Sequence, residues 1–395
     1  MADAGNRIEQ IQSAMGAAGL DAVVLRLTEN IVLATRWYTQ IPGLALVAIG
    51  RSGGATLLVP EYEAAEAAET WPGDIRTFPA IRNDGPAPGA EIQRRLSELA
   101  SEHGAEGGVV GYEGSFESIA PGSIHGEPNA VALPTQALLK ATFATDRLQD
   151  FTETLEALRA VKTEDEIELI RRTNEIAVLG LEAFKEHAVP GNSEVEVMAA
   201  VEHAISAQGH GHKGARWVRG FCTIYSGPDL AEGWKYWRAR TRRIERGDAV
   251  MLELGTVADG YWSDHTRTVV AGAATPRLRD AYAAVQAAVQ AGFAAAKPGA
   301  TGGEVDAASR AACAAAGFTQ FPHHTGHGTG FRYHESRPQL VPDGADVLSQ
   351  GNVIITEPGI YGAELNGGVR HEDNAVVTDR GAVVLATTDF PLELE

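Results

Sequence analysis

Two eight-residue segments with the same residue frame occur in the second half of this 395-residue chain, and this repeat limits the folds open to that half. Each copy has a Pro-Gly turn, a Ser/Thr-x-x-Glu capping box and an Ala-rich helical segment that runs to a glycine, Gly209 or Gly317. Strand-like segments follow each copy. We therefore predict two related helix-plus-sheet units that face one another; the alternative is a coincidental pair of Pro-Gly turns. The copies are Pro190-Gly191-Asn192-Ser193-Glu194-Val195-Glu196-Val197 and Pro298-Gly299-Ala300-Thr301-Gly302-Gly303-Glu304-Val305.

The first part of the chain alternates helical and strand patterns. Apolar strand-like runs such as DAVVLRL, LALVAIG and ATLLVP alternate with amphipathic runs such as AEIQRRLSELA, which predicts a small α/β domain. From Asp146 the pattern becomes long and helical, and Thr163-Glu164-Asp165-Glu166 forms a further capping box. We predict a boundary near residue 150, with an α/β domain over 1–150 and a second domain over 151–395, in an α+β chain.

Charge and composition exclude several classes of protein. The net charge of -19 repels nucleic acid, and the basic run 238–246 is interpreted as a solvated face or hairpin. No stretch approaches the roughly 20 apolar residues of a membrane span. The first residues lack the basic start and apolar core of a secretory signal, and the two cysteines, Cys222 and Cys313, lie far apart. We expect a cytoplasmic protein with no nucleic-acid or membrane partner.

Carboxylates interrupt several strand-like segments. By the period of two, Glu253 in AVMLELG lies opposite Leu252 and Leu254, and Glu357 in VIITEPG shares a face with Val353. Two further acids, Asp264 in GYWSDHTRT and Glu372 in GGVRHEDNAVV, have apolar neighbours as well. Burying four carboxylates costs several kcal/mol each unless they are protonated, paired or bound to metal.

Two ways of stabilising these acids follow from the sequence. Arg267 and Arg370 each lie close in sequence to one of the acids, but two arginines cannot neutralise four carboxylates. Two divalent ions do so formally, and an oxygen-rich site with one imidazole suits manganese, zinc, cobalt or iron in a bridged pair. The alternative is a set of separate carboxylates solvated at strand edges.

Histidines are concentrated in the glycine-rich segment PHHTGHGTGFRYHE, where glycines let the backbone pass close to a site. His327 is the best metal candidate, and His323 and His334 are candidates to polarise a carbonyl group. We expect the other neighbouring histidines to turn away from the site; these are His324, His265 and His371. His210 and His212 are assigned to a surface loop.

These segments together resemble the pita-bread metallopeptidases, the group of prolidase, aminopeptidase P and methionine aminopeptidase, with creatinase as a metal-free relative. The resemblance runs in order through Glu253, SDHTRT, HHTGHGTG with a trailing HE, TEPGIY and GGVRHEDNAVVT, across roughly residues 150 to 390. The preceding α/β domain is similar to the creatinase-type N-terminal domain. The resemblance implies a pita-bread C-terminal domain and homodimers, with the loop around Arg36, Trp37 and Tyr38 closing a neighbour's small pocket.

The resemblance also implies residue roles. Asp264 and Glu372 bridge two metal ions, Glu253 holds one of them, and His327 with Glu357 holds the other. Glu357 doubles as the general base or proton shuttle. His323 and His334 match the family's substrate-side histidines, and Arg370 matches an arginine behind the ligands that contributes to substrate binding.

Two departures from the family pattern affect substrate and metal. Glu253 stands where the family usually has Asp, so one metal position is shifted and single-metal occupancy stays open. Tyr236 stands where proline-directed members and creatinase have a substrate-contacting histidine. Trp234, Tyr236 and Trp237 form either an aromatic substrate pocket or a plain hydrophobic cluster.

The leading hypothesis is a metal-dependent hydrolase of a C–N amide bond, an Xaa-Pro dipeptidase or aminopeptidase with a dipeptide or small-molecule substrate. A second hypothesis is a specialised enzyme for a non-peptide metabolite, either an ectoine-hydrolase-like or creatinase-like hydrolase or a lyase. A third is a non-catalytic binding protein on the same scaffold.

Overall fold

The computed structural model describes residues 2–41, 43–80, 87–115, 133–235, 238–318, 321–386 and 388–394. The chain divides into two compact units, residues 1–159 and 160–395, and each is described by itself. The sequence-based boundary near residue 150 stays a prediction.

The first unit is built on a mixed sheet in the order β4-β3-β2-β1-β5-β6. Strand β1 pairs antiparallel with β2 and parallel with β5. The strands are β1 (Ala22–Leu25), β2 (Leu46–Gly50), β3 (Ala55–Pro60), β4 (Asp74–Phe78), β5 (Val110–Tyr112) and β6 (Leu148–Asp150). The helices are α1 (Ala2–Ala18), α2 (Thr28–Thr35), α3 (Ala64–Thr70), α4 (Pro88–Glu102), α6 (Leu133–Phe143) and α7 (Thr152–Ala160).

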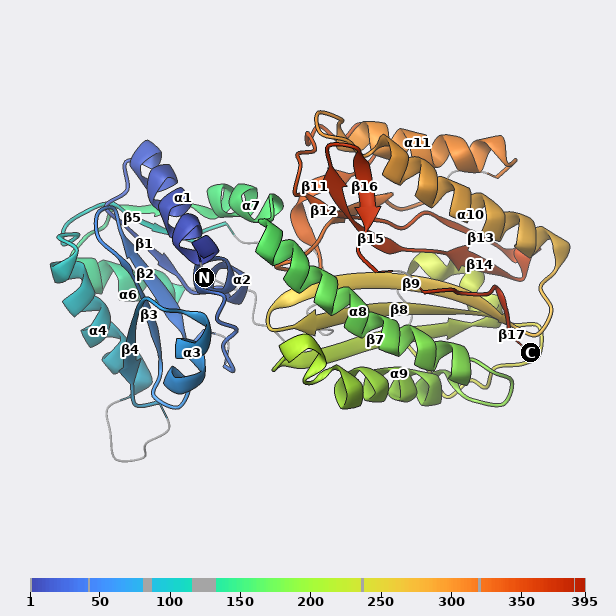
Figure 1. Ribbon diagram of the computed structural model, residues 1–395, viewed down its shortest axis with the longest axis horizontal. Helices are drawn as coiled ribbons and strands as arrows, with labels where there is room; N and C mark the ends of the chain where they lie inside the picture. The colour runs from blue at the N-terminus through green and yellow to red at the C-terminus, as the bar shows by residue number, and fades with distance from the viewer. Residues whose placement is uncertain are drawn as a thin grey trace. The chain divides into compact units, whose positions relative to one another are not determined.

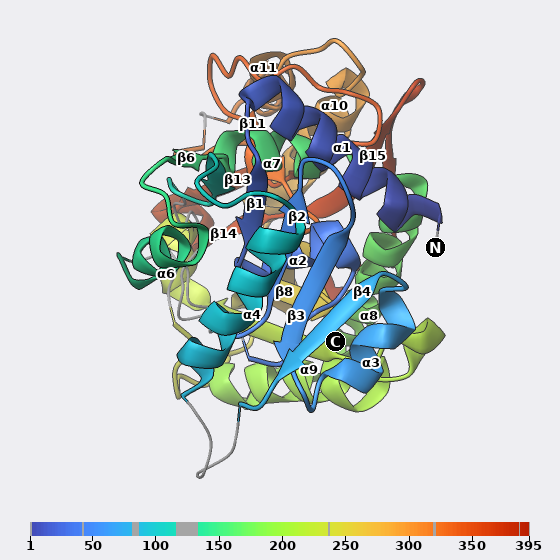
Figure 2. The same cartoon turned by 90° about the vertical axis from the view of Figure 1, so that its left-hand side faces the viewer.

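Helices α4 and α6 cover one face of this sheet (Figure 2). In α4, Ile92, Leu96 and Leu99 follow the helical period, and all three are buried against apolar side chains of the strands. The alternating patterns of the sequence therefore fold as a small α/β unit, as expected.

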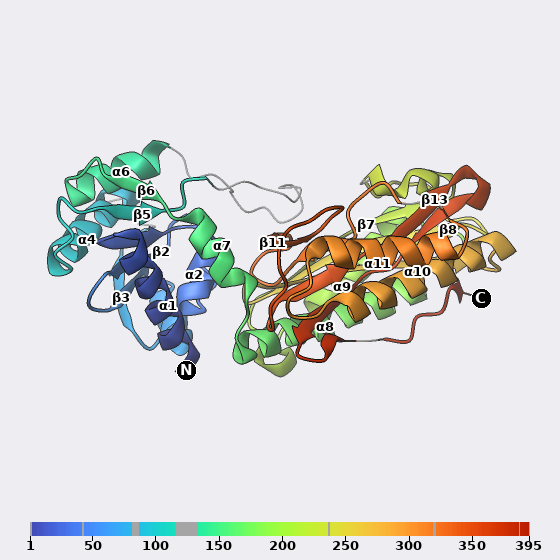
Figure 3. The same ribbon diagram turned by 90° about the horizontal axis from the view of Figure 1, so that it is seen from above.

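The second unit has three sheets, which are β17-β9-β8-β7 in its first half and β11-β10-β12-β15-β16 and the two-stranded β13-β14 in its second half. Each half has its own pair of helices on its outer face (Figures 1 and 3). Helices α8 (Glu164–His187) and α9 (Glu194–Gly209) pack on the sheet β17-β9-β8-β7, and α10 (Pro276–Ala295) and α11 (Gly302–Ala315) pack on the strands of the other half. The inner faces of β14 and β15 meet β8 and β9. The first half contains β7 (Val218–Ser226), β8 (Ala249–Ala258), β9 (Tyr261–Ala271) and the short helices η1 (His212–Gly214) and η2 (Gly227–Lys235). The second half contains β10 (Gly326–Gly328), β11 (Glu335–Leu340), β12 (Val353–Thr356), β13 (Gly359–Gly362), η3 (Ala363–Leu365), β14 (Gly367–Arg370), β15 (Asp373–Thr378) and β16 (Gly381–Val384), and β17 (Glu393–Leu394) returns to the first sheet.

The sequence repeat is a structural repeat. Ser193 with Glu196, and Thr301 with Glu304, each form a complete capping box at the start of α9 and α11. The turns before the two helices make the same backbone hydrogen bonds to the segment that leads into β8 or β12. The matching pairs are Gly191 N to Ile244 O and Gly299 N to Leu348 O, Ile244 N to Asn192 O and Leu348 N to Ala300 O, and Glu194 N to Arg242 O and Gly302 N to Asp346 O.

The two helices differ slightly at their ends. Helix α9 has 16 residues and ends at Gly209, whereas α11 has 14 residues and ends two residues before Gly317. Gly317 has a left-handed φ of 80°, which a residue without a side chain adopts at low cost. Among the described residues, no helix is both long and apolar enough to cross a bilayer.

Candidate metal centre

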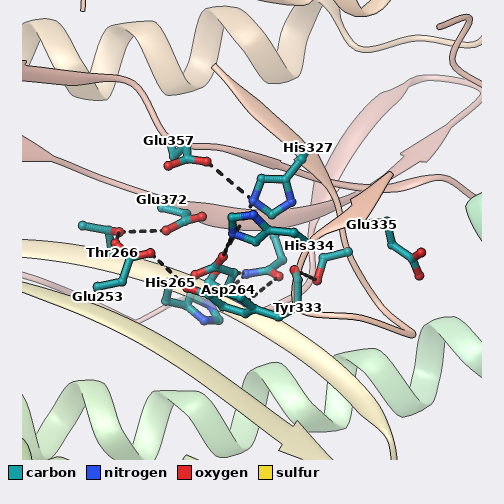
Figure 4. Close-up of polar contacts among 12 residues, drawn as sticks. Glu253, Asp264, His265, Thr266, His327, Tyr333, His334, Glu335, Glu357 and Glu372 are labelled. Carbon is teal, nitrogen blue, oxygen red and sulfur yellow. Dashed lines mark hydrogen bonds and ion pairs between the residues drawn. The ribbon is translucent and has the colours of Figure 1, made fainter. Parts of the chain in front are cut away.

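Each half of the second unit contributes a pair of acids to one interior. Glu253 lies on β8 and Asp264 on β9, and they are 3% and 1% exposed. Glu357 follows β12 and Glu372 lies between β14 and β15, and they are 7% and 0% exposed. Glu357 follows Glu253 by 104 positions and Glu372 follows Asp264 by 108, close to the 108-residue offset of the repeat. The two pairs are therefore equivalent positions of the repeat, and they face each other (Figure 4).

The strand register explains why these side chains converge. Leu252 and Leu254 pack in the core beneath α8 and α9, so Glu253 projects from the opposite face, as predicted. Gly255 pairs with Asp264, and Thr266 pairs with Glu253 and bridges to Glu372. The alternation of two adjacent strands thus places the acids on one face.

His327 completes the cluster from β10. Its Nδ1–H donates to the Gly328 carbonyl at 2.8 Å, which leaves Nε2 as the acceptor nitrogen facing the acids. This Nε2 lies 3.6 Å from Glu357 Oε1 and 3.7 Å from Asp264 Oδ2. His334 Nε2 lies 3.3 Å from Asp264 Oδ2 (Figure 4).

Burial and mutual repulsion shift the pKa values of these groups. Burial, with Glu372 and Glu357 nearby, raises the pKa of Asp264 well above its usual value. Burial and Glu357 also raise the pKa of Glu372 to about 8, and burial lowers the pKa of His327 to about 4. Burial acts to raise the pKa of Glu357 as well, but the neighbouring histidines, above all His324, outweigh it and lower that pKa. An interior of this kind attracts added positive charge.

Several buried atoms in the cluster have no hydrogen-bond partner among the described residues. Both carboxylate oxygens of Asp264, Glu372 Oε1 and His327 Nε2 are in this state. Buried polar atoms are normally satisfied, so four such atoms in one interior fit ligands whose partner is a metal ion. Donor atoms within 4.8 Å of one another form three groups: Glu253, Asp264 and Glu372; Asp264, His327 and His334; and His324, His327 and Glu357.

Glu253 has a different environment from Asp264. Its carboxylate accepts hydrogen bonds from the Tyr333 hydroxyl (2.9 Å) and the Thr266 hydroxyl (3.0 Å), and it forms an ion pair with Arg370. Arg370 is 3% exposed and also donates from Nε to Thr266 Oγ1 at 3.1 Å. The longer Glu253 side chain is therefore held in place by three neighbours.

Arg267 does not neutralise the cluster. Its Nη2 pairs with Asp373 Oδ1 at 2.5 Å, and its Nη1 donates to the Glu372 carbonyl at 2.6 Å. Of the two arginines weighed as partners for the acids, only Arg370 contacts one of the four carboxylates.

Of the remaining residues predicted from the sequence, some lie within the described part of the structure and some lie outside it. His323 Nε2 lies 3.0 Å from the Tyr361 hydroxyl, and burial lowers the pKa of His323. Tyr236 and Trp237 lie outside the described residues, and Trp234 is 43% exposed.

The expectation that His324 turns away from the site is wrong. Its Nε2 lies 2.8 Å from Glu357 Oε1, and the pKa of His324 is raised by Glu357. The loop path from Pro322 to β10 sets this orientation, and residue spacing alone does not predict it. His265 and His371 do turn away, toward Asn374 and Asp373, and His212 pairs with Glu175.

Sequence reasoning also missed Tyr333 and Thr266 as neighbours of the acids. Thr266 follows Asp264 by two positions in a strand, so the same alternation that identified the acid places the hydroxyl beside it. Tyr333 is in the histidine-rich segment, but its contact joins residues 80 positions apart.

Comparisons with known proteins agree with this fold. Residues 168–379 match the metallopeptidase family M24, and residues 7–161 match the creatinase/prolidase N-terminal domain. The chain is 30% identical to the uncharacterized peptidase YqhT of Bacillus subtilis over 98% of this chain and 99% of that protein. It is 38% identical to the Xaa-Pro dipeptidase of Pyrococcus furiosus over 61% of this chain and 67% of that protein.

Solved structures of prolidases and Xaa-Pro dipeptidases resemble the whole chain. The prolidase of Pyrococcus horikoshii superimposes with a TM-score of 0.77 at 29% identity, covering 98% of this chain and 99% of that one. An Xaa-Pro dipeptidase from Bacillus anthracis gives a TM-score of 0.80 at 26% identity, covering 99% of each chain. These matches confirm the expected α+β fold with a creatinase-type N-terminal domain and a pita-bread C-terminal domain. The buried acids, His327 Nε2 facing them and these matches lead to one conclusion: the chain is a metal-dependent peptidase and belongs to metallopeptidase family M24.

Proposed function

We propose that this enzyme hydrolyses the amide bond of short Xaa-Pro peptides, as a dipeptidase or aminopeptidase that uses two divalent metal ions. The convergence of Glu253, Asp264, His327, Glu357 and Glu372 in one interior is the observation that carries this proposal. The names of its relatives, which include Xaa-Pro dipeptidases and prolidases, support the substrate class.

The ligands divide between two positions. Asp264 and Glu372 would serve as ligands at both positions, Glu253 would hold one ion, and His327 with Glu357 would hold the other. The atoms of Asp264, Glu372 and His327 that have no partner among the described residues support this assignment. Bound divalent ions lower the pKa of a water molecule and polarise the substrate carbonyl.

The chain's own residues supply proton transfer and orientation. Glu357 Oε1 receives the proton of the attacking water and passes it to the leaving amine; its lowered pKa keeps it ionised at neutral pH. His323 and His334 orient the substrate carbonyl from the two ends of the histidine-rich segment. Arg370 positions Glu253 through their ion pair, and Tyr236 and Trp237 contribute to the substrate pocket.

The metal, the assembly and the location are part of the same proposal. Manganese, zinc, cobalt and iron all suit mixed carboxylate and imidazole ligands. We propose a homodimer in the cytoplasm; the free thiols of Cys222 and Cys313 agree with a reducing compartment. Trp37 is 3% exposed and donates from Nε1 to Glu63 within its own unit, whereas Arg36 and Tyr38 in the same loop are half-buried.

The test is metal reconstitution of chelated enzyme, followed by assays with matched Xaa-Pro and Xaa-Ala dipeptides. The proposal predicts turnover restored by manganese, cobalt, zinc or iron and a preference for the Xaa-Pro peptide. Retained metal without turnover of any peptide contradicts the peptidase assignment and favours a non-peptide substrate. Less than about one ion per chain in the purified protein contradicts the metal site, because several ligands of this kind retain metal strongly.

A further inference from the structure

We propose that His324 is a metal ligand, so that one position of the centre carries two imidazoles and Glu357 while the other carries carboxylates alone. This inference rests on the proposed metal centre and deepens it. The juxtaposition of His324, His327 and Glu357, with donor atoms within 4.8 Å of one another, carries the inference.

The loop that carries His324 is tied to the strand end that carries Glu357. The Glu357 N–H donates to the Thr325 carbonyl at 2.7 Å, and the Thr325 N–H donates to the Leu340 carbonyl at 2.9 Å. The Thr325 hydroxyl donates to Asp306 at 2.7 Å, in the buried interior. These bonds fix the backbone after His324, and the Arg310 guanidinium fixes it before His324 by donating to the His323 carbonyl at 2.7 Å. The fold therefore places the His324 ring beside the acid.

The ring geometry suits two nitrogens that share one ion. The centroids of His324 and His327 are 5.6 Å apart and the rings are inclined by 78°, so their Nε2 atoms can approach a common ion from separate directions. His327 Nε2 is buried and has no hydrogen-bond partner among the described residues. The rings of His327 and His334 are only 3.7 Å apart and inclined by 38°, which leaves no room for separate coordination directions. His324, and not His334, is therefore the second imidazole at this position.

The different ligands of the two positions give them different metal preferences. Neutral imidazole adds a donor without adding charge to an interior that already holds four carboxylates and Arg370. Imidazole suits zinc, cobalt and iron, whereas carboxylate oxygens suit manganese and magnesium. The two positions therefore differ in metal preference, and cobalt or zinc fills the position of His324, His327 and Glu357 first.

The competing explanation is that His324 only donates a hydrogen bond to Glu357, at 2.8 Å. Two substitutions separate these roles. His324→Ala removes both functions, whereas His324→Gln keeps an N–H donor but offers a poor ligand. The side chain of His324 is 36% exposed, so neither change disturbs a packed core. His187→Ala, at the exposed end of α8, is the matched control.

The experiment is titration of the metal-free, full-length enzyme with cobalt(II), followed by calorimetry and by the visible absorption bands, which depend on the ligand set. We expect His324→Ala and His324→Gln to weaken the first cobalt equivalent by about tenfold or more and to shift its bands, while His187→Ala matches the wild type. Wild-type bands and affinity in His324→Ala, or rescue of both by His324→Gln, overturn the inference and leave the proposed function intact. A wild-type enzyme that binds no metal overturns both.

Discussion

Buried carboxylates occur in both units of this chain, but they are stabilised differently. In the first unit Glu63 and Glu113 are both fully buried, and each is surrounded by hydrogen-bond donors. In the second unit Asp264 is as deeply buried, but its surroundings are two further acids, Glu357 and Glu372, and the imidazole of His334, whose Nε2 lies 3.3 Å from Oδ2. The donors to Glu113 are the Arg26 and Leu27 N–H groups and the Asn30 amide, and the donors to Glu63 are Trp37 Nε1, the Thr39 hydroxyl and the Gln40 N–H.

The number of hydrogen-bond donors around a buried acid distinguishes a structural carboxylate from a metal ligand. A buried carboxylate with several donors has its hydrogen bonds satisfied within the protein, since the donors replace part of its lost water. Four carboxylates gathered without enough donors need positive charge from elsewhere. The same comparison gives four predictions.

The largest effect is expected from Asp264→Asn, because Asp264 is proposed to hold both ions and is buried beside two other acids. The change removes a bridging charge and should lower peptidase activity by about three orders of magnitude, the scale of losing a principal charge-stabilising group. Metal content by elemental analysis should fall as well. The metal-free variant should unfold at a higher temperature than the metal-free wild type, because an unsatisfied charge is gone. An unchanged metal content would place the ions elsewhere.

Metal removal should destabilise the second unit only. At a metal concentration of 1,000 times Kd, binding adds about 4 kcal/mol to the free energy of unfolding. We therefore expect a chelator to lower one calorimetric transition and to leave the transition of the first unit in place. Equal losses in both transitions would contradict a centre confined to the second unit.

Ionisation of the buried Glu113 should lower the free energy of unfolding of the first unit as pH rises, whether or not metal is bound to the second unit. Burial raises the pKa of Glu113 from its usual value of 4.5 to about 7, even though backbone and Asn30 donors act against it. The folded state therefore holds this proton more tightly than the unfolded state. The resulting stability is complete below pH 4.5 and is lost as pH rises through about 7.

The Glu113 contribution amounts to about 3 kcal/mol at 1.36 kcal/mol per pKa unit. Glu113→Gln should flatten this part of the stability profile, measured by denaturant unfolding at several pH values. A profile identical to that of the wild type would show that Glu113 is not the titrating group.

The smallest effect is expected from Tyr333→Phe, which removes one donor to Glu253 and keeps the ring. Tyr333 packs edge-on against Phe221, with centroids 5.1 Å apart, so the fold should not change. Loss of a hydrogen bond to a metal ligand typically costs tenfold to a hundredfold in affinity. Because Thr266 and Arg370 still hold Glu253, we expect about tenfold at one metal equivalent, measured by calorimetry. A loss shared by both equivalents would mean that Tyr333 supports the whole centre.

Local patterns predicted much of this architecture. The capping boxes at Ser193 and Thr301 and the inward face of Glu253 depend on periods of two to four residues, so they are visible in the sequence. The outward turn expected for His324 was wrong because its direction is set by Thr325 and Asp306, 19 positions apart. The partner of Arg267 is Asp373, 106 positions away, and such pairings depend on the assembled sheets.

The most direct measurement is a crystal structure of the metal-loaded enzyme with anomalous difference maps at the metal absorption edge. The account predicts metal peaks between Asp264 and Glu372, with His327 and Glu357 at one ion and Glu253 at the other. Two results would contradict the proposed metal centre. In one, the acids point to different places; in the other, they gather around Arg370 and no metal peak is present.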